Sequence, residues 1–142
     1  MIIIPQTKGG VGKSTVAMQV IAPYLYKKHG KKITYIEIDD ENNDSRSFTR
    51  TEIVNKRMLG TNKLSELDEL ILMDDNHEVI VDVGGNKTSS LVLEEIKKVG
   101  SFGNIKWIIP LGDGELDGKN AISTMKKIEK SKEIQKKILF LL

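Results

Sequence analysis

The chain has 142 residues, a length typical of one domain, and is 39% hydrophobic and 30% charged. This composition excludes collagen, coiled coil and wholesale disorder. The lack of cysteine excludes disulfide scaffolds, thiol nucleophiles and cysteine-held metal clusters. The net charge of +2 does not by itself indicate a nucleic-acid partner. Because the apolar stretch before Pro5 is too short for a signal peptide or a membrane span, we expect a cytoplasmic protein without a membrane segment.

Five short apolar runs, rich in Ile and Val, predict buried parallel strands. They are Ile2–Ile4, Ile33–Ile38, Val79–Val83, Trp107–Leu111 and Ile138–Leu142. Helical patterns lie between them at Ser14–His29, Leu64–Asp74, Ser89–Val99 and Leu116–Ser131. This alternation predicts an α/β fold, a single domain over residues 1–142 with a doubly wound, mostly parallel sheet. Sheets of this kind bind ligands at the carboxyl ends of their strands.

Two segments fit this pattern less well. Pro23 lies inside the first helical pattern, where it removes a hydrogen bond and is expected to kink or break the helix. The stretch Glu41–Asn62 is polar and weakly periodic, and we expect it to be partly helical.

A glycine-rich segment joins the first predicted strand to the first predicted helix. Its sequence is Lys8-Gly9-Gly10-Val11-Gly12-Lys13-Ser14-Thr15. Glycines let the backbone curl so that successive N–H groups point at a phosphate, and the start of a helix offers more of them. In such a loop Lys13 reaches the β- and γ-phosphates and the Ser14 hydroxyl binds Mg²⁺. The usual first glycine of the loop is replaced by Thr7, and an extra lysine stands at Lys8.

This octet is a deviant Walker A motif, and on it the chain resembles the ParA/MinD superfamily of P-loop ATPases. The resemblance implies a P-loop NTPase fold, ATP and Mg²⁺ as cofactors, and a homodimer that forms on ATP binding. It assigns to Lys8 a role across the dimer interface, on the phosphates of the partner. A cation supplied in this way neutralises charge on the transferred phosphoryl group, as an arginine finger does. A glycine turn with incidental lysines is the alternative interpretation.

Acidic residues at the ends of two further strands complete the site that the resemblance implies. It places Asp39 beside Mg²⁺ and the attacking water, and it makes Asp82 a Walker B residue that holds Mg²⁺ through water. Gly84 and Gly85 match the segment that senses the γ-phosphate. Glu37 replaces an Asp of the family, which leaves its contact to metal-bound water open. An ordinary acidic loop at Asp39 and a strand-terminating turn after Asp82 are the alternatives.

Two features of the C-terminal third bear on function. Members of the family continue beyond the apolar end at Ile138–Leu142, so we expect the C-terminal part of the family fold, with its adenine-recognition loop, to be missing. The segment Lys126–Lys137 holds six lysines and two glutamates. This segment is either a surface for nucleic-acid phosphates or an ordinary solvated helix face.

Together these observations favour a ParA-type ATPase that acts in plasmid or chromosome partition. It would bind DNA without sequence preference when ATP is bound, and a ParB-like partner would stimulate its weak hydrolysis. A MinD-like membrane-positioning ATPase is one alternative, although Lys126–Lys137 lacks a bulky apolar face. A non-catalytic, nucleotide-dependent interaction protein is another, motivated by Glu37.

Overall fold

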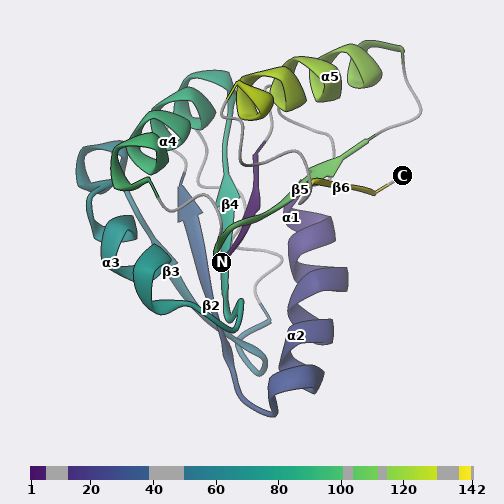
Figure 1. Cartoon of the computed structure of the whole chain (residues 1–142). Coiled ribbons are helices and arrows are strands. Elements are labelled where there is room, and N and C mark those ends of the chain that lie inside the picture. Colours follow the sequence, from purple (N-terminus) through teal and green to yellow (C-terminus); the bar gives the residue numbers. More distant parts are fainter. Residues whose placement is uncertain (6–12, 39–49, 101–103, 112–114, 131–137, 142) are drawn as a thin grey trace.

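The computed structural model describes residues 1–5, 13–38, 50–100, 104–111, 115–130 and 138–141, with the backbone alone for 13, 86, 115–117 and 138–141 (Figure 1). Its sheet has six strands in the order β3-β2-β4-β1-β5-β6, and every neighbouring pair is parallel. The strands are β1 Ile2–Ile4, β2 Ile33–Ile38, β3 Val54–Met58, β4 Val79–Val83, β5 Lys106–Pro110 and β6 Ile138–Leu141. The predicted α/β fold with a parallel sheet is therefore confirmed.

Helices cover both faces of the sheet, as a doubly wound fold requires (Figure 1). The helical elements are α1 Lys13–Val16, the π-helical turn η1 Ala17–Ile21, α2 Ala22–His29, the 3₁₀ turn η3 Thr61–Lys63, α3 Glu66–Met73, α4 Asn86–Val99 and α5 Glu115–Glu129. The segment from α1 to α2 packs on one face, where Met18 and Leu25 meet Ile80 of β4. Helices α3, α4 and α5 pack on the other face, around the fully buried Trp107 of β5.

The predicted helical character of Glu41–Asn62 is wrong for its second half. The chain forms the edge strand β3 at Val54–Met58, in register with β2, and then only the short η3 turn. A strand at the edge of a sheet keeps much of its surface in solvent, so it can be built from Asn, Lys and Arg without an apolar pattern. The first half of the predicted segment, residues 41–49, lies outside the described residues.

Pro23 does not break the first helix. The chain runs from Lys13 to His29 in successive helical elements, with the π-helical turn η1 directly before the proline. The Ala22 N–H donates to the carbonyl oxygen of Ala17, five residues back. Because a proline lacks an N–H and its ring crowds the carbonyl of the preceding turn, the wider π-helical turn lets the helix continue.

The strand order places a switch point beside β1. From β1 the chain moves to β2 on one side of it, and later from β4 to β5 on its other side. A doubly wound sheet binds ligands in the crevice that such a reversal opens at the carboxyl ends of its strands. Strand β1 ends and α1 begins on either side of the glycine-rich segment in sequence, so a ligand site is expected at this end of the sheet.

Candidate functional site

The carboxyl ends of the neighbouring strands β2, β4 and β1 lie side by side at the switch point. Asp82 of β4 is the register partner of Ile4 in β1 and of Glu37 in β2. Register partners on parallel strands point to the same face, so the side chains of Asp82 and Glu37 share the face that α1 covers. In sequence, the predicted phosphate loop begins four residues after Ile4, at Lys8.

The structure brings together two of the predicted site residues, Ser14 and Asp82, which are 68 positions apart in sequence. Ser14 lies in the first turn of α1, and its hydroxyl donates a hydrogen bond of 2.6 Å to Oδ2 of Asp82. Asp82 is only 3% exposed, so a charged oxygen is held inside the protein at the end of β4. Burying a carboxylate is costly unless donors or cations stabilise it, and Ser14 supplies one such donor.

A second donor to Asp82 is Tyr35 of β2, which was not among the predicted site residues. The Tyr35 hydroxyl lies 2.6 Å from the same Oδ2 atom, and its side chain is 1% exposed. Burial, and then the charge of Asp82, raise the pKa of Tyr35 far above its ordinary value. Tyr35 therefore stays protonated and donates to Asp82. A signal was present in the sequence, because Tyr35 precedes Glu37 by two positions and must point to the same face of β2.

The other carboxylate, Glu37, forms an ion pair with Lys56 of β3. The Lys56 Nζ lies 2.8 Å from Glu37 Oε2, and the side chains are 13% and 6% exposed. Lys56 was missed because its segment was expected to be partly helical rather than a strand. The Glu37 carboxylate, whose contact to metal-bound water the sequence leaves open, thus has a protein cation beside it.

Gly84 and Gly85 make the turn from β4 into α4. The Gly84 N–H donates to the Ile38 carbonyl at 2.8 Å, which extends the pairing of β4 with β2 past Asp82. Gly85 has a φ of +32° and immediately precedes α4, where a side chain would be strained. This turn starts α4 three residues before the predicted Ser89. The proposed sensing of a γ-phosphate by these glycines remains a prediction.

Several predicted site residues lie outside the described residues. They are Lys8, Gly9, Gly10, Val11, Gly12 and Asp39. Lys13 is described by its backbone alone, as the first residue of α1, and Thr15 is exposed in the same helix. Their predicted roles stay predictions.

The described donor atoms suit a magnesium ion. Ser14 offers a hydroxyl oxygen and Asp82 a carboxylate oxygen, the hard ligands that Mg²⁺ prefers. Within the described ranges no group of three or more His, Cys, Asp or Glu could hold a metal ion. Mg²⁺ is usually bound by one or two protein oxygens together with water and phosphate oxygens, and Ser14 and Asp82 are suited to such a partial set of ligands.

Comparison with protein-family models gives a match. A family model described as an AAA domain, AAA_31, matches residues 1–101. This span includes the glycine-rich segment, strands β1 to β4, and the Ser14, Tyr35 and Asp82 cluster. A search of curated proteins finds no match. In the described part of the chain, no helix has the length and apolar character that crossing a membrane requires.

Proposed function

Because this chain belongs to the AAA_31 family of AAA domains, P-loop ATPases of the ParA/MinD type, we propose that it binds ATP with Mg²⁺ and dimerises in the bound state. Its role would be plasmid or chromosome partition, through DNA binding that depends on the nucleotide. A ParB-like partner would stimulate a weak hydrolysis of ATP to ADP and phosphate.

The observation that carries this proposal is the hydrogen bond from Ser14 to Asp82 at the switch point of the sheet. It joins the residue that follows the loop lysine to the acidic residue that ends a buried strand, the two residues expected to flank Mg²⁺. When bound, Mg²⁺ would neutralise charge on the β- and γ-phosphates.

The remaining roles follow the sequence predictions. We assign Lys13 to the phosphates of the same subunit, and Lys8 to the phosphates bound by the partner subunit. The backbone N–H groups between these lysines would cradle the phosphates, and Asp39 would orient the attacking water. Gly84 and Gly85 would report the γ-phosphate to α4, which starts directly after them.

The test compares the wild type with Lys8→Ala and Lys13→Ala, and with Lys28→Ala as the control. Lys28 is exposed near the end of α2, remote in sequence from the loop. ATP binding, dimer mass and phosphate release are measured with Mg²⁺. We expect Lys13→Ala to lose nucleotide binding, and Lys8→Ala to keep binding but lose dimerisation or hydrolysis. Lys8→Ala that behaves like Lys28→Ala would contradict the role of the second lysine.

The ion pair between Glu37 and Lys56 favours a second candidate, a nucleotide-dependent interaction protein that does not hydrolyse ATP. The Lys56 ammonium lies 2.8 Å from Oε2 of Glu37, so this carboxylate is paired with a protein cation on β3. A carboxylate paired in this way is less available to metal-bound water. Tight ATP binding and ATP-driven dimerisation without phosphate release, even with a partner present, would support this candidate over the ATPase.

A further inference from the structure

We propose that one outward face of α5 binds the phosphate backbone of nucleic acid through Lys119, Lys126 and Lys130, here called the α5 lysine face. This inference rests on the proposed function and names the surface by which DNA binding would occur.

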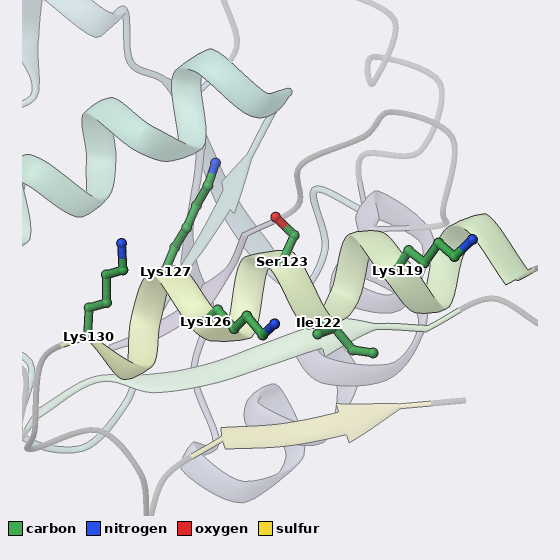
Figure 2. Close-up of a pocket in the computed structure, with 6 residues that line it drawn as sticks. All are labelled: Lys119, Ile122, Ser123, Lys126, Lys127 and Lys130. Atoms are coloured by element: carbon green, nitrogen blue, oxygen red, sulfur yellow. The ribbon is translucent and has the colours of Figure 1, made fainter.

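The α5 lysine face borders an open groove of about 360 Å³ (Figure 2). The groove is lined by Lys119, Ile122, Ser123, Lys126, Lys127 and Lys130. Four of these six side chains are cationic and none is acidic. An anion that enters the groove thus meets positive charge along its length, and no lining carboxylate repels it.

Helical geometry explains why the lysines gather on one side. The three residues are separated by seven and then four positions, which are two turns and one turn of an α-helix. At 1.5 Å per residue, their Cα atoms are spread over roughly 16 Å of the helix axis. Ala121, Thr124 and Ile128 are buried on the opposite side of the same helix, so packing on the sheet turns the lysine face outward.

The spread of charge favours a polyanion over a single phosphate group. Duplex DNA carries one negative charge for about every 1.7 Å of its axis, so a row of ammonium groups can contact several phosphates at once. Lysine is a compact point charge without the planar fork that reads base edges, so binding should not depend on base sequence.

A membrane fits this face less well. Among the lining residues, Ile122 is the one exposed large apolar side chain, at 49%. A helix that lies in a membrane interface presents several bulky apolar groups beside its cations.

A contact joins this region to the end of the sheet that holds the candidate nucleotide site. The Nζ of Lys127, which lies between the two C-terminal lysines of the face, is 3.4 Å from Oγ of Ser90 in α4. Helix α4 begins only four residues after Asp82. A change in the position of α4 on nucleotide binding would therefore reach the lysine groove, which gives a physical route for nucleotide-dependent binding.

The test replaces all three residues of the α5 lysine face by Gln and compares the variant with a control that loses the same charge elsewhere. The control carries Lys27→Gln, Lys28→Gln and Lys97→Gln, at exposed positions on α2 and α4. Affinity for a short random-sequence duplex DNA is measured by fluorescence anisotropy at several salt concentrations, with ATP and Mg²⁺. ATP binding and dimer mass are measured on the same samples.

We expect the lysine-face variant to lose roughly 100-fold in affinity near 0.1 M salt, with a salt slope lower by about 2 to 3, because each lost phosphate contact removes about 0.9 from the slope. The control should keep the wild-type slope, and both variants should keep ATP-driven dimerisation. Equal losses in both variants, or wild-type affinity in the lysine-face variant, would overturn the proposal while leaving the ATPase function standing.

Two further arms separate other ligands from nucleic acid. Lysine-dependent binding to phosphatidylserine vesicles or to polyglutamate, with none to DNA, would overturn the proposal in favour of a membrane or an acidic protein. Loss of ATP-driven dimerisation in the lysine-face variant would also overturn it, since the lysines would then act in folding or assembly. If the wild type fails to dimerise with ATP, the proposed function itself fails.

Discussion

The hydrogen bond from Tyr35 to Asp82 offers the sharpest test of the candidate site. Tyr35→Phe removes one hydroxyl and leaves the ring, which packs in the core beside Ile33 and Ile80. The change should therefore leave the packing of the sheet intact and act on the Asp82 carboxylate.

The expected cost can be worked out from the geometry. A hydrogen bond to a charged group contributes about 1.5–3 kcal/mol, and both partners here are almost fully buried. Because Ser14 also donates to Oδ2, Asp82 keeps at least the Ser14 donor after the substitution. We therefore expect the lower end of the range, a loss of about 1.5–2 kcal/mol in the free energy of unfolding.

The same substitution should weaken the proposed binding of Mg²⁺. A hydrogen-bond partner that orients a metal ligand typically changes metal affinity by about 10–100-fold. Denaturant unfolding without nucleotide measures the stability loss, and ATP affinity titrated against Mg²⁺ measures the second effect. Tyr24→Phe is the matched control, since Tyr24 is 63% exposed on α2.

A double-mutant cycle isolates the contact. In an Asp82→Asn background Tyr35→Phe should cost clearly less than in the wild type, because the charged acceptor is gone. If Tyr35→Phe matches Tyr24→Phe in stability and in Mg²⁺ dependence, the assignment of Tyr35 as a positioning residue for Asp82 is wrong.

Three more predictions concern an ion pair near the site, the core and a histidine beside the N-terminus. Lys56→Met removes the ammonium beside buried Glu37 and should cost about 3 kcal/mol in unfolding free energy, with part recovered by adding Glu37→Gln. Trp107→Ala empties a fully buried site and should cost about 3–5 kcal/mol by denaturant unfolding. Burial, and then the charge of the Met1 ammonium 2.8 Å away, lower the pKa of His77. As pH falls below about 6.5 the unfolded chain binds the proton first, so stability should decline toward pH 5.

Each of these predictions has a contradicting result. If adding Glu37→Gln to Lys56→Met lowers the free energy of unfolding further, the ion pair between the two residues is not the source of the loss. A loss below about 1 kcal/mol for Trp107→Ala would mean that the core does not close around the indole. His77→Asn keeps a residue type that tolerates the φ of 57° and should flatten stability between pH 5 and 7. An unchanged slope would assign the pH dependence to other groups.

Much of the framework was predictable from sequence because its signals are local. Buried parallel strands are apolar on both faces, so β1, β2, β4, β5 and β6 stand out in the sequence as short, mostly apolar runs. The glycine-rich segment is likewise recognisable from sequence, because glycine is the residue type that permits the backbone conformations of a phosphate-binding loop. Many buried strands end in Asp, so Asp82 becomes a candidate only together with the glycine-rich segment upstream.

Other features depended on neighbours distant in sequence. The edge strand β3 pairs with the edge of β2. The mostly polar residues of β3 show no pattern that predicts a strand. The π-helical turn before Pro23 makes room for the proline ring, so the helix continues where the sequence pattern predicted a kink or break.

The pairing of Tyr35 with Asp82, and of Glu37 with Lys56, was likewise decided by tertiary structure. Strand order and register place these side chains at one end of the sheet, and no spacing along the chain encodes the order β3-β2-β4-β1. Local sequence thus determined which groups could carry the chemistry, whereas the choice of which groups meet came from the packing of strands that are remote in the chain.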